Sequence, residues 1–177
     1  MINLFSVPLI LLYSILFGIF MKIADFHNEH RLKLFKGGAI FFGVFFGIFG
    51  SLIILSNNVL ANAILALIIA SLARGLIDYP NHGIAGTIML ITFFLKSTLE
   101  VNIFFPLFIA FASLGFIEDY LSNKIKKKTK IPKRLPFYSV VSLTFSIISG
   151  IWILFFIFLC YEILYILTDK IYPKILK

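Results

Sequence analysis

Long apolar segments dominate this chain and decide what it can fold into. Six of them cover residues 2–21, 37–55, 59–79, 83–95, 101–117 and 137–167. An α-helix rises about 1.5 Å per residue, so it needs about 20 apolar residues to cross the roughly 30 Å hydrocarbon core of a membrane. Since most of the segments approach this length, they predict an all-α, polytopic integral membrane helical bundle with about six transmembrane helices.

The composition excludes a soluble fold. Hydrophobic residues make up 60% of the chain, charged residues only 14%, and the mean hydropathy is +1.03. This leaves too little polar surface to coat a soluble core. A membrane β-barrel does not fit either, because the apolar segments are continuous rather than alternating. We therefore expect a single transmembrane domain over residues 1–177, located in the cell membrane.

Two features of these segments leave alternatives open. The last segment, residues 137–167, is longer than one perpendicular crossing needs. We favour a single tilted helix there, although Ser149-Gly150 could divide it into two half-length pieces. In the second segment, Gly43, Gly47 and Gly50 predict a small-residue ridge where another helix backbone can approach closely. The alternative is that these glycines reflect ordinary transmembrane composition.

The basic residues predict the orientation. Lys and Arg concentrate in loops on the cytoplasmic side of membrane proteins. Twelve of the 16 basic residues follow the first, third or fifth segment or, for Arg74, lie near its end, and the other side holds only Lys96, Lys170, Lys174 and Lys177. This pattern predicts cytoplasmic loops after those three segments and both termini on the outside. The net charge of +8 then lies in loops, where it favours membrane lipids over nucleic acid as the partner.

Acidic residues gather on the same predicted membrane face. Five of the eight carboxylates close the first, third and fifth segments: Asp25, Glu29, Asp78, Glu118 and Asp119. Ionisable groups in or near a membrane are costly and are candidates for function. Oxygen ligands suit hard divalent cations. The sequence therefore predicts Mg²⁺ or Mn²⁺ as a cofactor, with Asp25, Glu29, Glu118 and Asp119 as its ligands.

A structural interpretation of the same residues stays open. Arg74 and Asp78 are four residues apart, as are Glu29 and Lys33, so each couple could form an ion pair along a helix. The two acids that end the fifth segment could balance the basic loop after it. A histidine-based zinc site is disfavoured, since a lone histidine at an interface is more often a satisfied polar residue than a ligand, and the single Cys160 rules out a zinc thiolate set. The sequence also lacks a nucleophilic serine or cysteine motif and a glycine-rich phosphate loop.

Short motifs resemble the polyprenyl-phosphate hexosamine-1-phosphate transferases. Residues 25–31 (Asp-Phe-His-Asn-Glu-His-Arg), followed by Gly37-Gly38, look like the first cytoplasmic loop of that family, with its Asp-x-Pro-Asn-x-Arg stretch. Residues 75–79 and 115–120 are similar to the family's acidic helix ends. The resemblance covers about the first two thirds of the chain. His27 stands where the family has proline, Tyr79 replaces an aspartate, and the later catalytic aspartate and histidine-rich loop have no counterpart.

The leading functional hypothesis is a metal-dependent, phosphotransferase-like membrane enzyme that acts on a lipid phosphate at the cytoplasmic face. Its catalytic residues would be Asp25, Asp78 and Asp119. Its substrate-binding residues would be Asn28, Arg31, Arg74 and His82, because phosphoryl transfer needs mainly positioning and charge neutralisation. One alternative is a noncatalytic scaffold or subunit that binds anionic lipid, a membrane partner protein or a second copy of the chain. The other is a transporter of ions or small solutes.

Overall fold

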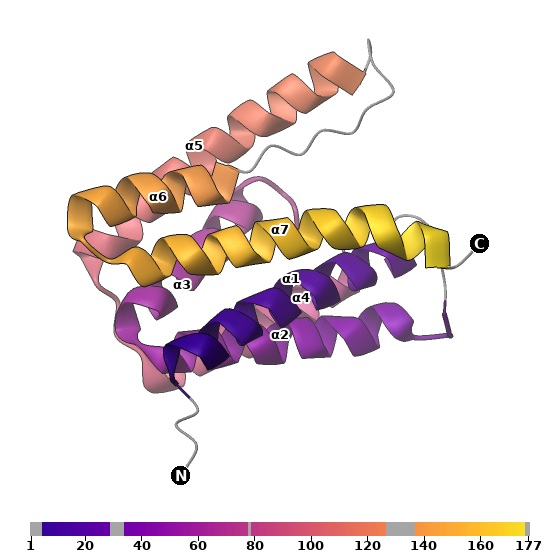
Figure 1. The fold of residues 1–177 in the computed structure, drawn as a ribbon, viewed down its shortest axis with the longest axis horizontal. Coiled ribbons are helices and arrows are strands. Elements are labelled where there is room, and N and C mark those ends of the chain that lie inside the picture. Colours follow the sequence, from indigo (N-terminus) through magenta and orange to yellow (C-terminus); the bar gives the residue numbers. More distant parts are fainter. Residues whose placement is uncertain (1–4, 29–33, 78, 127–136, 176–177) are drawn as a thin grey trace.

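The computed structural model describes residues 5–28, 34–77, 79–126 and 137–175 of the chain, with the backbone alone for 121–126 and 174–175. All regular structure within these ranges is α-helical (Figure 1). The helices are α1 (Val7–Asn28), α2 (Gly38–Ser56), α3 (Asn58–Ala73), α4 (Pro80–Lys96), α5 (Val101–Lys126), α6 (Phe137–Ser149) and α7 (Trp152–Ile175).

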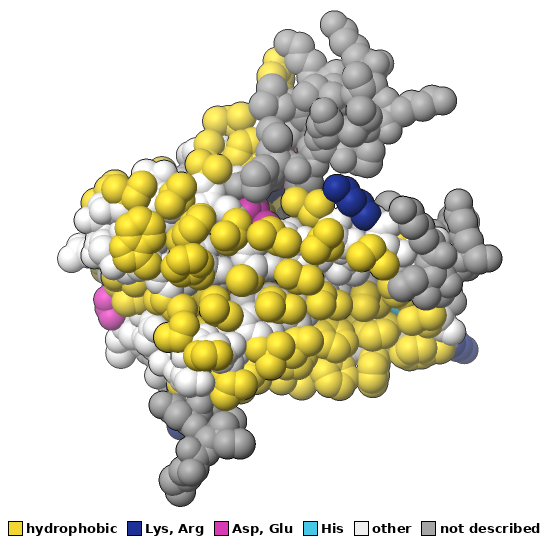
Figure 2. All heavy atoms as spheres, in the orientation of Figure 1, with side chains coloured by type: hydrophobic (Ala, Val, Ile, Leu, Met, Phe, Trp, Pro, Cys, Tyr) yellow, Lys and Arg dark blue, Asp and Glu magenta, His cyan; other side chains and the backbone are white. Residues whose placement is uncertain are grey.

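Four of the described helices are long and apolar enough to cross a membrane. They are α1, α2, α5 over Val101–Tyr120 and α7 over Trp152–Pro173, whereas α3 and α6 are shorter apolar helices. The predicted all-α architecture is confirmed, and these spans indicate a multi-pass membrane protein. The outer surface agrees, because apolar side chains cover most of the face drawn in Figure 2. Ile148 and Phe94, for example, are 82% and 75% exposed.

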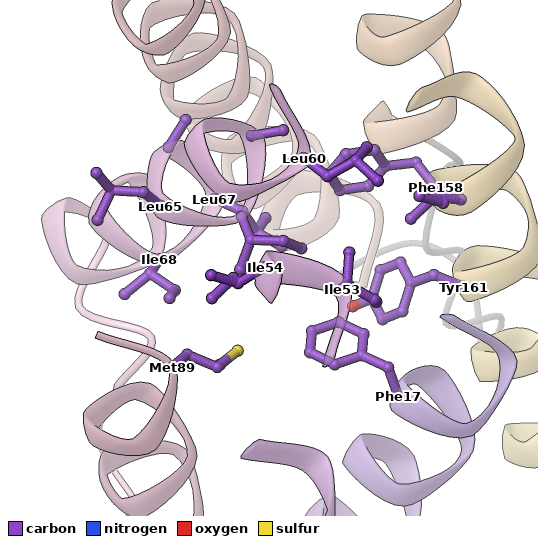
Figure 3. Close-up of a cluster of buried hydrophobic side chains, with 14 of the residues drawn as sticks. Phe17, Ile53, Ile54, Leu60, Leu65, Leu67, Ile68, Met89, Phe158 and Tyr161 are labelled. Carbon is purple, nitrogen blue, oxygen red and sulfur yellow. The ribbon is translucent and has the colours of Figure 1, made fainter. Parts of the chain in front are cut away.

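The core forms around α3. Nearly every residue from Leu60 to Ala70 is buried, as expected of a helix that is apolar on all sides. Figure 3 shows side chains of α3 meeting Ile53 and Ile54 at the end of α2, Met89 of α4 and Phe158 of α7. A short helix surrounded by longer ones therefore fills the centre of the bundle.

Helices α1 and α7 run parallel and in constant register. The Ser14 hydroxyl donates to the Ile157 carbonyl, and the Lys22 ammonium to the Tyr165 hydroxyl, with the same separation of 143 residues in each pair. The start of α1 and the finish of α7 consequently lie at opposite ends of the bundle (Figure 1). Within the described residues the prediction of both ends of the chain on one side was wrong, because an odd number of helices, seven, lies between Val7 and Ile175. We call the end at which α1, α3, α5 and α7 finish the charged end.

The last apolar segment is two helices rather than the single tilted helix that we favoured. Helix α6 ends at Ser149, and Gly150 adopts a φ of +76°, a conformation that suits glycine because it has no Cβ. Helix α7 then returns antiparallel to α6. Gly150, at which the sequence allows this segment to divide, is therefore the residue that makes the turn.

The third helix stops earlier than Pro80. Gly75, with a φ of +69°, donates its N–H to the Leu72 carbonyl, and the Leu76 N–H bonds the Ser71 carbonyl. This pair of bonds is the Schellman motif, which ends a helix with a left-handed residue. Pro80 instead opens α4 at its first position, where a missing N–H costs nothing. Arg74 and His82 therefore do not share a helix.

The predicted small-residue ridge on α2 is confirmed as a packing surface. A Cβ added at Gly43 would lie 2.9 Å from the Asn81 Cα, and one added at Gly47 would lie 3.0 Å from the Ala85 Cα. Gly50 meets Met89 further along the same two helices. These contacts bring the backbones of α2 and α4 together, as small residues do between membrane helices.

Candidate functional site

Asp25 anchors a buried polar cluster at the charged end. It lies one turn before the end of α1 and is only 3% exposed. One carboxylate oxygen lies 2.8 Å from His82 Nε2 of α4, and the other accepts a hydrogen bond of 3.0 Å from the Tyr165 hydroxyl of α7. The second ring nitrogen of His82 lies 3.1 Å from the Leu76 carbonyl oxygen. Asp25 therefore joins three helices, and His82 ties them to the link before α4.

Lys22 extends this cluster toward solvent. Its ammonium lies 2.9 Å from Asp169 of α7 and within 5.0 Å of the centres of the Phe26 and Tyr165 rings. It also donates to the Tyr165 hydroxyl over 3.4 Å. A continuous series of polar contacts thus connects Asp169, Lys22, Tyr165, Asp25 and His82. Cation–π contacts and an ion pair compensate for the burial of the lysine.

Asn28 and Asn81 form a second link between α1 and α4. The Asn28 amide donates to the Asn81 side-chain oxygen, one turn from the contact between Asp25 and His82. The Asn81 amide nitrogen is buried and has no hydrogen-bond partner in the described part of the chain. Two side-chain contacts in successive turns thus hold the end of α1 to the start of α4.

Arg74 is the centre of a separate cluster around the end of α3. Its guanidinium donates two hydrogen bonds of 3.0 Å to Asp119 of α5 and one of 3.2 Å to the Tyr138 hydroxyl of α6. Glu118 lies 3.9 Å away. Burial by itself lowers the pKa of Arg74, but the hydrogen bonds and charge of Asp119, together with Tyr138, outweigh it and raise the pKa above its usual value. The guanidinium therefore stays charged and forms a bidentate ion pair.

Gly115 makes room for this guanidinium. A Cβ at that position would meet Arg74 Cζ at 2.5 Å and Nε at 2.6 Å. The arginine side chain consequently lies flat against α5, one turn before the carboxylate that it binds. Glycine on α5 and the acid pair at 118–119 together fix the position of Arg74.

Glu162 holds the first turn of α6. This residue of α7 is 6% exposed, and its carboxylate accepts hydrogen bonds of 3.0 Å from the backbone N–H groups of Tyr138 and Ser139. It also accepts the Ser139 hydroxyl. The first N–H groups of a helix lack partners within it, and a negative charge there is favourable. Glu162 therefore acts as a cap supplied from a neighbouring helix.

The structure brings together some of the predicted site residues and separates others. Asp25 meets His82, Asn28 lies in the next turn, and Arg74 meets Asp119 and Glu118. Glu29, Arg31 and Asp78 lie outside the described residues, and so do both helical ion pairs considered for them. Arg74 pairs with Asp119 of another helix. The described residues contain no group of three or more acidic, histidine or cysteine side chains that could hold a metal, so the Mg²⁺ or Mn²⁺ site stays a prediction.

Several residues of these clusters were not predicted from the sequence. Tyr138 and Tyr165 come from the last apolar segment, and Asp169 follows it. Their contacts depend on the register of α7 against α1 and on the return of α6. Lys22 offered a local signal, since it precedes Asp25 by three residues and so shares its helix face. Glu162 offered another, as an acid inside an apolar run needs a partner.

Comparisons with protein-family models, with functionally described proteins and with solved structures found no match to this chain. The resemblance to the polyprenyl-phosphate transferases therefore stays a prediction. What the geometry supports is a multi-pass helical bundle whose described acids at the charged end engage basic side chains of neighbouring helices.

Proposed function

We propose that the chain is a noncatalytic membrane scaffold or subunit that binds the phosphate groups of anionic lipids at its charged end. The observation that carries this proposal is the parallel arrangement of α1 and α7. Because of this arrangement, Lys170 and Lys174 of α7 lie at the end of the bundle at which α1 also finishes. By position in the sequence, 15 of the 16 basic residues lie near the carboxyl ends of α1, α3, α5 and α7 or in the segments that follow them, and only Lys96 lies near the end of another helix.

The acids at this end do not neutralise the excess. By position in the sequence, six acidic residues lie near the carboxyl ends of the same four helices or just after them, namely Asp25, Glu29, Asp78, Glu118, Asp119 and Asp169. Within the described part, Asp25 engages His82, Asp119 engages Arg74 and Asp169 engages Lys22, so these acids act on side chains inside the bundle. Basic residues near an anionic membrane contribute about 1 kcal/mol each to binding. We also place this end on the cytoplasmic side, following the distribution of positive charge.

Binding rather than turnover is favoured by the same contacts. An enzyme that transfers a lipid phosphate would need cations or a metal available to the transferred group. Arg74 is instead held by Asp119, and both oxygens of Asp25 contact protein groups. An enzyme would instead release phosphate or headgroup from the lipid, and the experiment below measures this release.

The test compares anionic with zwitterionic lipid on purified protein. Phosphatidylglycerol should raise the melting temperature Tm in neutral micelles more than phosphatidylcholine does, and added salt should weaken the effect. Changing all seven basic residues of 124–134 to Gln should remove most of this difference, whereas the matched change Lys96→Gln at the other end should leave it intact. Equal stabilisation by both lipids would overturn the proposal. Release of phosphate or headgroup from the lipid would replace it with the enzymatic hypothesis.

A further inference from the structure

Helix α6 is attached to the rest of the bundle in an unusual way. It has 13 residues, about half the length of its neighbour α7 with 24. Its carboxyl end is joined to α7 by Gly150, whose positive φ permits a sharp turn. Its amino end is held by Glu162, and Tyr138 of its first turn also receives a hydrogen bond from Arg74. These polar contacts hold the two ends of the helix, which also packs along α7 and against α5.

The interface between α6 and α7 is rich in serine. Ser139, Ser142 and Ser146 are all buried and lie along one face of α6. The Ser142 hydroxyl donates to the Ser139 carbonyl, and the Ser146 hydroxyl donates to the Ile151 carbonyl. The Ser142 bond lies within α6 and would be kept if α6 moved as a unit, whereas the Ser146 bond spans Gly150 and would have to rearrange.

In a membrane, the hydrogen bonds from the first N–H groups of α6 to Glu162 matter more for holding α6 in place than its apolar contacts do. Helices in a membrane gain no hydrophobic free energy from meeting, because lipid tails are as apolar as the side chains they replace. Phe111 and Phe158 pack around the Tyr138 ring, but lipid could take their place. Lipid could not replace the carboxylate that accepts the first N–H groups of α6, since unsatisfied backbone groups are costly there.

We propose that α6 is a strap that swings toward the lipid about Gly150, and that Glu162 is the catch that keeps it closed. Closing the strap buries the guanidinium of Arg74, whose side chain is 3% exposed. Opening it would separate Tyr138 from both Arg74 and Glu162 and would expose the serine face. This opening does not depend on lipid binding by the charged end, because its contacts lie within α3, α5, α6, α7 and their links.

Glu162→Gln weakens the catch with almost no change in shape. A glutamine keeps one oxygen acceptor but turns an N–H group toward a backbone N–H, so one of the two bonds is replaced by a repulsive contact. The reporter is Ser142→Cys in a Cys160→Ala background, labelled by a water-soluble maleimide. Ser142 is 0% exposed, so the closed strap should protect the thiol. We expect Glu162→Gln to raise the labelling rate on the order of tenfold, which corresponds to about 1.4 kcal/mol.

Two controls separate opening of the strap from general unfolding. The first is Ser14→Cys, also 0% exposed but located between α1 and α7, which should stay protected when Glu162→Gln is present. The second is Glu100→Gln, an acid at the other end of the bundle that accepts from Asn58, which should leave labelling at 142 unchanged. Equal labelling rates at 142 with Glu162 and with Gln would overturn the proposal. A matching rise at position 14 would also overturn it, since the catch would then hold the whole fold.

Discussion

The substitution Gly43→Ala tests the close approach of α2 and α4. The added Cβ would lie 2.9 Å from both the Cα and the carbonyl oxygen of Asn81. Carbon atoms prefer separations of about 3.5–4.0 Å, so the helices must part by about 0.6 Å. The obstructing atoms belong to the backbone, and a change of side-chain rotamer cannot relieve the contact. Overpacking of this kind costs about 1–3 kcal/mol.

A matched control removes the effect of helix propensity. Replacing glycine by alanine within a helix is worth up to about 1 kcal/mol when nothing else changes. Gly83 lies in α4, and an added Cβ there would have no neighbour within 4 Å. Gly83→Ala should therefore keep or raise the free energy of unfolding. The difference between the two variants isolates the packing cost, about 1–3 kcal/mol.

The assay is thermal unfolding of both variants in the same detergent. For a chain of this size, 1 kcal/mol shifts Tm by about 2–4 °C, so Gly43→Ala should melt roughly 2–12 °C below Gly83→Ala. The variants should both elute as folded protein at low temperature. Coincident melting curves would refute the reasoning, because the two helices would then have room for a methyl group that the structure denies them.

Three further predictions follow from the polar clusters. Asp119→Ala should lower Tm more than the double change Asp119→Ala with Arg74→Ala, because the single change leaves a buried guanidinium without its main partner. The coupling free energy between the two residues in a double-mutant cycle should be only about 1 kcal/mol, since the Asp119 side chain is 41% exposed. Asn62→Ala should cost about 1–3 kcal/mol in denaturant unfolding, since Asn62 is fully buried and bonds the Asn58 and Thr98 carbonyls and the Glu100 N–H. If Asp25 and Asp119 bind the predicted Mg²⁺ or Mn²⁺, millimolar cation should raise Tm and Asp25→Asn or Asp119→Asn should remove the rise; an unmoved melting curve would eliminate the site.

The helical class and the glycine ridge could be predicted because both depend on local pattern. Apolar length identifies membrane helices without any knowledge of their neighbours. Gly43, Gly47 and Gly50 recur at helical spacing on one surface of α2, and that surface meets α4. The acids at helix ends were likewise recognised as residues that need partners.

The partners themselves could not be predicted, because they follow from the register of distant helices. Arg74 has a local candidate partner at position 78, yet Gly75 ends the helix and the guanidinium reaches Asp119 of α5. Asp25 meets Tyr165 only because α7 runs parallel to α1, which in turn requires the reversal at Gly150. The turn at Gly150, which we did not favour from the sequence, therefore changed both the end of the bundle at which α7 finishes and the residues of the candidate site.

Sided labelling of single cysteines tests this arrangement most directly. In a Cys160→Ala background, cysteines at Lys128, Lys170 and Lys96 would be treated with a membrane-impermeant maleimide in sealed vesicles. The account predicts that positions 128 and 170 react from the same side and that position 96 reacts from the other. Labelling of position 170 together with position 96, and opposite to 128, would contradict the parallel arrangement of α1 and α7 and with it the concentration of basic residues at the charged end.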